Sequence, residues 1–229
     1  MPLFTIADLH LSLQENKPMD IFGGSWQGYV DKLRANWIKT VGENDTVVIP
    51  GDLTWSMTLQ NALADFVFLE SLPGSKILLK GNHDYYFQTR AKLTAFFEIN
   101  GIKSIDILHN NYFEYEDIAL CGTRGWTIDP AQGDEDVKIL NREIIRLAAS
   151  LDAAGDDREK IVFLHFPPVY RKYACQPMLE LFDKHGVKRC YYGHLHAGAR
   201  EFAFEGTRNG VEYKLVSGDN LDFLPCKVL

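Results

Sequence analysis

Short apolar runs alternate with helical segments along most of this sequence, and that alternation restricts the fold more than any other feature. The runs are rich in β-branched and aromatic residues, and we predict them to be buried strands: Leu3–Ala7, Thr46–Ile49, Lys76–Lys80, Ile118–Cys121, Ile161–Leu164 and Arg189–Tyr192. Segments with apolar residues at helical spacing lie between them: Trp26–Thr40, Leu59–Ser71, Gln88–Ile99, Val137–Ala153 and Met178–His185. Strands that alternate with helices indicate an α/β fold with a largely parallel or mixed sheet.

Two segments depart from this alternation and predict β-hairpins. Phe202–Phe204 and Val211–Val216 are joined by a polar, glycine-containing connection. Asn110–Glu116 pairs in the same way with the run that begins at Ile118, with a turn at Glu116-Asp117. Because no Pro/Gly/Ser-rich linker divides the 229 residues, we expect a single domain over residues 1–229.

Charge and composition exclude several classes of protein. The net charge is −7 and no long basic run occurs, so binding to nucleic acid or to an anionic membrane is not expected. No apolar run approaches the ~20 residues of a membrane helix. The four cysteines form no Cys-x-x-Cys pair, which is typical of thiols in a reducing compartment. These features predict a cytoplasmic protein without a membrane partner.

Polar residues that can bind metal follow five of the predicted strands. In chain order they are Asp8 and His10, Gly51-Asp52, Gly81-Asn82-His83-Asp84, His165, and Gly193-His194-Leu195-His196. The ligand sites of open α/β sheets lie outside the carboxyl ends of the strands. We therefore expect these side chains to meet at one end of the fold.

The number and type of these donors predict a centre of two metal ions. Two carboxylates, one amide oxygen and four imidazoles are too many for one tetrahedral zinc, and they suit two ions that share a ligand: Asp8, Asp52, Asn82, His10, His165, His194 and His196. Mixed nitrogen and oxygen donors favour Mn, Fe or Zn over Ca and Mg. Two such ions with only two carboxylates keep a local positive charge, which attracts phosphate and activates water.

Three further residues are candidates for catalysis or substrate binding. His83 is placed to be a general acid toward a leaving oxygen, and the carboxylate of Asp84 could fix its tautomer. Arg124 follows a strand in a glycine-flanked segment, and a guanidinium can grip phosphate bidentately. The segments Leu11–Gly28 and Thr123–Asp136 are the best candidates to shape the mouth of the site.

The ordered motifs resemble those of the calcineurin-like metallophosphoesterase superfamily, and they are similar to a compact bacterial branch of predicted phosphohydrolases. They span residues 8 to 196. The resemblance implies a four-layer α-β-β-α sandwich of two mixed sheets, with the dinuclear site at the carboxyl ends of the strands. It implies that one metal is held by Asp8, His10 and His196 and that the other is held by Asn82, His165 and His194. Asp52 would bridge the two ions, His83 would be the acid, Asp84 its partner, and Asn82 would also contact substrate.

Two departures from the motifs of the superfamily argue against protein phosphatase activity. The protein phosphatases of this superfamily continue the second motif to an arginine and end the third in Glu. Here the second motif reads Gly51-Asp52-Leu53-Thr54-Trp55, and the third ends in Asp84. We therefore expect a metal-dependent hydrolase of small phosphoesters, with phosphodiesters or nucleotides weakly favoured. Two alternatives stay open: a binding scaffold without catalysis on the same fold, and a nuclease of the same superfamily.

Overall fold

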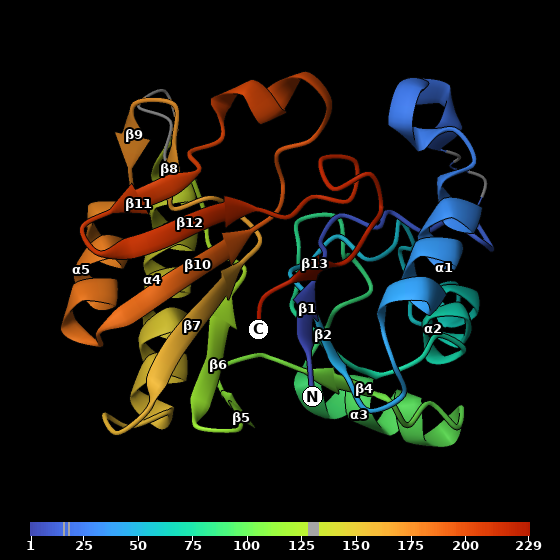
Figure 1. Cartoon of the computed structure of the whole chain (residues 1–229), viewed down its shortest axis with the longest axis horizontal. Helices are drawn as coiled ribbons and strands as arrows, with labels where there is room; N and C mark the ends of the chain where they lie inside the picture. The colour runs from blue at the N-terminus through green and yellow to red at the C-terminus, as the bar shows by residue number, and fades with distance from the viewer. Residues whose placement is uncertain (16, 18, 128–132) are drawn as a thin grey trace.

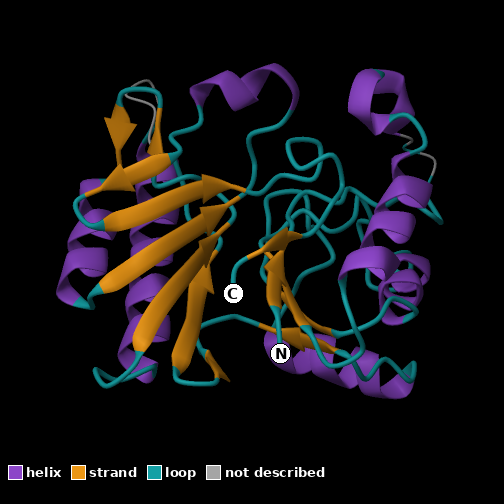
Figure 2. Cartoon of the chain, viewed as in Figure 1, coloured by secondary structure: helices purple, strands orange, loops and turns teal. Residues whose placement is uncertain are grey.

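Two β-sheets form the middle of the molecule and helices cover their outer faces, as Figures 1 and 2 show. The structure is a computed structural model that describes residues 1–15, 17, 19–127 and 133–229. Both sheets are mixed: their central strands are parallel, and the edge strands β13, β11 and β5 pair antiparallel with their neighbours.

The first sheet has the strand order β13-β1-β2-β3-β4. Its strands are β1 (Leu3–Thr5), β2 (Thr46–Ile49), β3 (Ser75–Leu78), β4 (Ile105–Ile107) and β13 (Cys226–Lys227). The four strands from β1 to β4 are parallel, so their carboxyl ends lie at one edge. β13, from the end of the chain, pairs antiparallel with β1.

The second sheet has the order β11-β12-β10-β7-β6-β5. Its strands are β5 (Phe113–Tyr115), β6 (Ile118–Thr123), β7 (Glu159–Leu164), β10 (Val187–Tyr192), β11 (Gly206–Arg208) and β12 (Val211–Leu215). The central strands β6, β7, β10 and β12 are parallel. A separate hairpin of β8 (Val169–Tyr170) and β9 (Tyr173–Ala174) follows β7.

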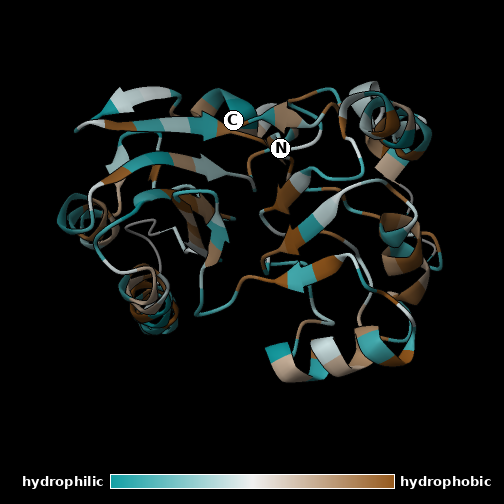
Figure 3. Cartoon of the chain, turned by 60° about the horizontal axis from the view of Figure 1, so that its bottom comes forward, coloured by the Kyte–Doolittle hydropathy of each residue, from teal (hydrophilic) through white to brown (hydrophobic). Residues whose placement is uncertain are grey.

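The helices carry one apolar face each, and Figure 3 shows polar and apolar residues mixed along them. The first sheet is covered by α1 (Tyr29–Thr40), α2 (Leu63–Glu70) and α3 (Arg90–Ile99); the second is covered by α4 (Asp134–Ala153) and α5 (Gln176–Lys184). In α1 the buried residues Tyr29, Leu33 and Trp37 recur every four positions and so form one stripe. The chain leaves α5 through Gly186 at φ 63°, a conformation that glycine adopts without steric cost.

Three buried apolar layers confirm the four-layer α-β-β-α arrangement. One layer lies between the first sheet and its helices, with Leu33, Phe66 and Leu93. A second lies between the other sheet and its helices, and a third contains residues from both sheets. Val48 and Phe163 belong to the third layer, which therefore joins the two sheets face to face.

The two sheets also meet through the backbone at their carboxyl ends. Ala7 donates to the carbonyl of Val216 at 2.8 Å, and Gly218 donates to the carbonyl of Ala7 at 2.8 Å. The segment that follows β1 is thereby tied to the segment that follows β12. This connection brings the loops of both sheets to one place.

The six strands and five helices expected from the sequence are all present, with ends that shift by a few residues. The hairpin turned at Glu116-Asp117 is confirmed as β5 and β6. The position of the other hairpin is wrong, because the strand that pairs with β12 is Gly206–Arg208 rather than Phe202–Phe204. Asn209 and Gly210, both at positive φ, form a two-residue turn, and such a turn fixes which residues pair. No helix among the described residues is long and apolar enough to cross a membrane.

Candidate metal centre

The seven predicted donors follow the carboxyl ends of five strands, as the sequence predicts. They follow β1 (Asp8 and His10), β2 (Asp52), β3 (Asn82), β7 (His165) and β10 (His194 and His196). Two groups of donors each lie within 4.8 Å of one another: Asp8, His10 and His196, and Asp8, Asp52 and His165. The structure thus brings both sheets to a single cluster of carboxylates and imidazoles.

The backbone at the cluster is held in an unusual conformation. Four of its residues have positive φ, namely Asp8 (57°), His10 (43°), Asp52 (52°) and His194 (70°). Non-glycine residues seldom adopt this region, and they do so mainly where function or packing requires it. The chain also passes very close to itself here, because a Cβ at Gly81 would collide with Asp52 and one at Gly193 would collide with Asp8.

The first group of donors is enclosed by aromatic rings. His10 stacks on Trp55, with ring centroids 4.8 Å apart, and meets the edge of Trp26 at 5.8 Å. The ring of His196 lies 5.3 Å from that of His10. Tyr29 donates its hydroxyl to the backbone carbonyl of His10 at 2.6 Å. These contacts fix the position of His10 and leave its ring nitrogens for another partner.

Asn82 joins the second group. Its Oδ1 lies 2.6 Å from His165 Nε2 and 3.0 Å from His194 Nδ1. The other ring nitrogen of His165, Nδ1, lies 3.1 Å from the carbonyl of Pro50. A proton on Nδ1 satisfies that carbonyl and leaves the Nε2 lone pair for a metal, which is how metal-binding histidines are commonly oriented.

Asp52 belongs to the second group and also approaches the first. Its Oδ2 is 3.8 Å from His10 Nε2 on one side and 3.4 Å from His165 Nε2 on the other. Asp8 belongs to both groups, but its contact with His165 is to Nδ1 at 3.9 Å, and that nitrogen also lies 3.1 Å from the carbonyl of Pro50. Asp52 is therefore the better placed carboxylate for a bridge.

The buried polar atoms of the cluster fit bound metal ions. Asp8 Oδ1, Asp52 Oδ2 and both ring nitrogens of His10 have no hydrogen-bond partner among the described residues. Buried polar atoms are normally satisfied, and a set of acceptors that face one another calls for cations. Burial raises the pKa of Asp8 to about 8 and lowers the pKa of His194 to about 4. Bound divalent ions would stabilise the ionised carboxylates, and they would bind the imidazoles in the neutral form that burial favours.

The expected pairing of Asp84 with His83 is wrong. Both carboxylate oxygens of Asp84 accept backbone N–H groups instead, from Gly81 at 2.7 Å, Asp52 at 2.8 Å and Leu53 at 2.9 Å. Asp84 is fully buried, and so these charge-assisted bonds replace its lost hydration. It ties the loop after β3 to the loop after β2, and it acts on the site by positioning Asp52.

His83 lies at the edge of the cluster. Its backbone N–H donates to Asp52 Oδ1 at 2.8 Å, and its ring lies 4.2 Å from Trp55 and 5.6 Å from His10. The ring nitrogen Nδ1 has no hydrogen-bond partner among the described residues. Burial, followed by the charge of His196, lowers the pKa of His83 below its ordinary value. The side chain is half-buried, so it faces both the donors and the approach to them.

Arg124 contacts Glu143 and Trp126. Its guanidinium lies 3.3 Å from the buried Glu143 carboxylate and 4.8 Å from the ring centroid of Trp126. Its backbone carbonyl accepts the N–H groups of His165 at 3.0 Å and Phe166 at 2.8 Å. Arg124 therefore positions His165 through its backbone, and a contact between its side chain and phosphate stays a prediction.

Sequence reasoning missed a supporting carboxylate, Asp219. It is buried and accepts the N–H of Ala197 at 2.7 Å, directly after His196. The signal for Asp219 in the sequence is the same as for the donors, because it is a polar residue that follows the predicted strand Val211–Val216. The segments predicted to shape the mouth of the site are Leu11–Gly28 and Thr123–Asp136. In the first of them, the ring of Trp26 contacts those of His10 and His196. Residues 16, 18 and 128–132 of these segments lie outside the described residues.

Comparison with known proteins identifies the class to which this fold and site belong. A family model for calcineurin-like phosphoesterases matches residues 1–198. The chain belongs to this family and is a metal-dependent phosphoesterase, in agreement with the resemblance of its motifs. No curated protein matches the sequence.

Several solved structures share the fold. The phosphopantetheinyl hydrolase of Mycobacterium tuberculosis has a TM-score of 0.62 at 12% identity. The match covers 100% of this chain and 95% of the hydrolase. A protein of unknown function from Aquifex aeolicus has a TM-score of 0.52 at 15% identity, and the match covers 99% of this chain and 95% of that protein. A Thermus thermophilus protein has a TM-score of 0.50 at 11% identity, with 92% and 86% covered. At these identities the likeness concerns the fold alone.

Proposed function

We propose that this protein hydrolyses small phosphoesters at a centre of two transition-metal ions, Mn, Fe or Zn, within one domain of residues 1–229. One observation carries the proposal. Asp52 Oδ2, a buried oxygen with no hydrogen-bond partner among the described residues, lies within 4 Å of imidazole nitrogens from both donor groups. An acceptor in that position suits a ligand that two cations share.

The chain's own residues would divide the work as follows. Asp8, His10 and His196 would hold one ion, and Asn82, His165 and His194 would hold the other. Asp52 would be the ligand that both ions share. When bound, such ions supply an activated water and stabilise charge on the phosphoryl oxygens. Asp84 and the carbonyl of Pro50 keep Asp52 and His165 in the required orientation.

His83 is the proposed general acid. It is the half-buried imidazole beside Asp52 that the ligand assignment leaves free, and its ring nitrogen Nδ1 has no hydrogen-bond partner among the described residues. Although burial lowers its pKa, an anionic phosphoester within ~4–6 Å favours the protonated imidazole. A proton on His83 would then be delivered to the oxygen that leaves phosphorus. Asn82 and Arg124 are proposed to contact the phosphoryl group.

The substrate class is a small phosphoester, and we favour a phosphodiester or nucleotide. The net charge of −7 argues against a nuclease, since nucleic-acid binding depends on basic surface. The full set of seven donors argues against a scaffold without catalysis. One structural neighbour is named as a phosphopantetheinyl hydrolase, so a phosphopantetheinyl ester belongs among the substrates to be tested.

A metal-supplemented screen tests the proposal. The purified protein, loaded with Mn, Fe or Zn, is offered phosphomonoesters, phosphodiesters, nucleotides and a phosphopantetheinyl ester. We expect turnover that a chelator abolishes, with two ions per chain by elemental analysis. No turnover of any ester with two ions bound would favour the scaffold. One ion or none under saturating metal would overturn the dinuclear centre.

A matched pair of variants tests which residue serves which ion. His194→Ala and His196→Ala each remove one imidazole from the same loop after β10. The first should weaken the ion held with Asn82, and the second should weaken the ion held with His10. Metal titrations of both variants should therefore each lose one of two binding steps, and the steps should differ. Loss of the same step in both would contradict the assignment.

A further inference from the structure

The ring of His83 is not oriented by the carboxylate that follows it in the sequence. Both oxygens of Asp84 accept backbone N–H groups, from Gly81, Asp52 and Leu53. The backbone N–H of His83 donates to Asp52 Oδ1 at 2.8 Å, which fixes the main chain and leaves the imidazole to be oriented by its own side-chain torsions. A general acid works only when its ring reaches the leaving oxygen. Another contact is therefore needed to hold the ring.

Among the described residues, Trp55 makes the closest ring contact with His83. The two ring centroids are 4.2 Å apart, and the ring planes are inclined by 49°. The rings of His10 and Tyr85 lie farther from His83, at 5.6 Å and 6.1 Å. Trp55 also stacks on His10, with centroids 4.8 Å apart and planes only 24° from parallel. One indole thus packs against a proposed metal ligand and against the proposed acid.

Trp55 is itself held by the segment that follows β1. Its backbone N–H donates to the carbonyl of Leu11 at 3.0 Å, and the N–H of Leu11 donates to the carbonyl of Leu53 at 2.8 Å. The indole Nε1–H donates to Met19 Sδ at 3.2 Å, and Met19 is buried. The bond from the main chain fixes where the side chain begins, and the bond from the ring fixes the direction of the indole.

A buried carboxylate supports the same loop. Asp65 of α2 is fully buried, and it accepts the hydroxyl of Thr54, the residue before Trp55. Its other oxygen accepts the N–H of Leu13 at 2.9 Å. Asp65 thereby joins the segment after β1 to the loop after β2, next to Trp55. A catalytic side chain keeps its geometry best when it packs on groups that are themselves locked in place.

We propose that Trp55 is the positioning residue of His83. Its indole restricts the rotation of the imidazole and holds it where its proton passes to the leaving oxygen, as water bonds to phosphorus and the bond to that oxygen breaks. Packing on an aromatic plane then replaces the carboxylate that orients the imidazole in a Ser-His-Asp triad. The inference rests on the proposed phosphohydrolase function and adds to it the residue that aligns the acid.

Substrates that differ only in the leaving group test this alignment. Phenyl phosphate and p-nitrophenyl phosphate, or their methyl diesters, form such a pair, and phenolate is the poorer leaving group. Trp55→Leu keeps apolar bulk but removes the flat ring. We expect kcat/KM to fall about 100-fold for the phenyl ester, since a misplacement of ~1 Å costs about 10²-fold. The nitrophenyl ester, which needs little acid assistance, should lose about threefold or less.

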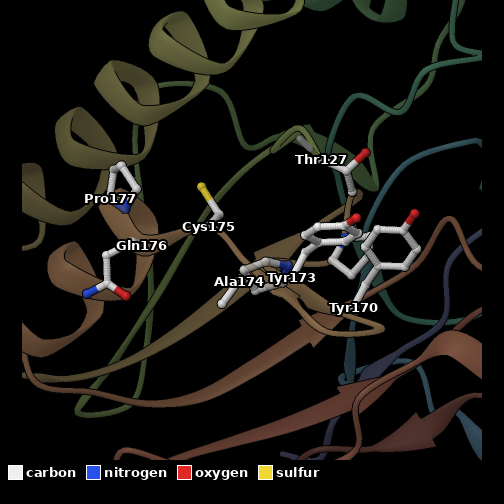
Figure 4. Close-up of a pocket in the computed structure, with 9 residues that line it drawn as sticks. Thr127, Tyr170, Tyr173, Ala174, Cys175, Gln176 and Pro177 are labelled. Atoms are coloured by element: carbon white, nitrogen blue, oxygen red, sulfur yellow. The ribbon is translucent and has the colours of Figure 1, made fainter. Parts of the chain in front are cut away.

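The conservative variant and a control variant complete this comparison. Trp55→Phe restores an aromatic plane and should recover most of the phenyl ester rate. Tyr173 supplies the control, because it is half-buried like Trp55 but lines a cavity of about 300 Å³ at the β8–β9 hairpin, where Figure 4 shows it beside Tyr170. Tyr173→Leu should leave both esters unchanged. The same selective loss in Tyr173→Leu would overturn the inference.

A double variant separates positioning from a structural role. If Trp55 acts through His83, Trp55→Leu should not change the ratio of the two ester rates further once His83→Ala has removed the acid. A further change of that ratio in the double variant would overturn the inference. Equal losses for both esters in Trp55→Leu, with or without loss of metal, would also overturn it.

A spectroscopic measurement does not depend on turnover. An indole that packs on an imidazole shifts the C–H resonances of the imidazole through its ring current. In the zinc-loaded protein with isotope-labelled histidine, the His83 signals are assigned by their absence from His83→Ala. They should move in Trp55→Leu and stay in place in Tyr173→Leu; unchanged His83 signals in Trp55→Leu would overturn the inference. If neither ester is hydrolysed, the proposed function fails, and the spectra still decide whether Trp55 holds the ring.

Discussion

The two sheets contribute different chemistry to the same centre. The first sheet supplies both carboxylates, the amide and one imidazole donor, from the ends of β1, β2 and β3. The second sheet supplies three imidazoles, from the ends of β7 and β10: His165, His194 and His196. One sheet thus supplies all the negative charge, and the other supplies neutral nitrogen donors.

Neither sheet supplies all the donors of one group by itself. The group with Asp8 and His10 takes its third donor, His196, from the second sheet. The group with His165 and His194 takes Asn82 from the first sheet. The backbone connection at Ala7 and the bond from the His194 N–H to Asp8 Oδ2 at 2.9 Å hold the two sides together. The donor cluster therefore forms only where the carboxyl ends of the two sheets meet.

The largest effect should come from removing the charge that both sides share. Asp52→Asn should release both ions and lower kcat/KM by about 10⁴-fold or more, because the bound ions account for several kcal/mol of transition-state stabilisation. Elemental analysis and diester kinetics measure the two effects. Asp45→Asn is a matched control, because Asp45 is a buried aspartate that precedes β2, whereas Asp52 follows it. Retention of both ions by Asp52→Asn would show that Asp8 is the bridge.

The next prediction concerns the general-acid role proposed for His83, which follows β3 of the first sheet. A general acid matters most when the leaving oxygen is a poor leaving group, and such assistance is worth ~10²–10⁴-fold. His83→Ala should therefore slow alkyl esters far more than nitrophenyl esters, with two ions still bound. The measurement is kcat/KM for both ester classes in both proteins. Equal losses would reject the acid role, and lost metal would make His83 a support of the centre.

Asp84 should show a smaller effect of a different kind. Asp84→Asn replaces one acceptor oxygen by an amide donor that faces backbone N–H groups, so the loops after β2 and β3 should separate. We expect a loss of about 10–100-fold in kcat/KM for alkyl and nitrophenyl esters alike, together with a lower Tm. A loss confined to alkyl esters would restore Asp84 as a partner of His83.

The comparison of the sheets also shows what the sequence can predict. The sequence predicts the donors because each of them follows an apolar run, and the carboxyl ends of parallel strands meet at one edge. The bond partners of Asp84 could not be found in this way, since the sequence does not show whether a carboxylate turns toward a neighbouring ring or toward the backbone. The short strands β8, β9 and β13 carry too few residues for a periodic pattern.

The contacts of Trp55 illustrate the same limit. It directly follows the second motif in the sequence, but the sequence does not show that its ring stacks on His10 and contacts His83. Stacking depends on how the loops after β1, β2 and β3 approach one another. Those approaches follow from Gly81 and from the positive φ of Asp8 and Asp52, which a single sequence does not reveal.

The smallest expected effect concerns the stability of the metal-free protein, where the two sheets should respond to pH in opposite directions. Burial raises the pKa of Asp8 from 3.8 to about 8 and lowers the pKa of His194 from 6.5 to about 4. Between about pH 4 and pH 8 the unfolded chain loses the Asp8 proton that the folded chain keeps, so stability falls as pH rises. Between about pH 6.5 and pH 4 the unfolded chain binds a proton that folded His194 does not, so stability falls as pH decreases.

Two substitutions separate these opposite slopes. In EDTA, Asp8→Asn should raise Tm at about pH 8 and have little effect at about pH 5, because it removes the acid whose ionisation the folded state resists. His194→Gln should do the reverse. Each gain should appear as a rise in Tm at the pH named, and not at the other. Calorimetry across this range measures both, and added metal should cancel the advantage of Asp8→Asn because the ion stabilises the carboxylate. Parallel shifts of both variants at every pH would mean that packing, and not charge, distinguishes the two sides of the centre.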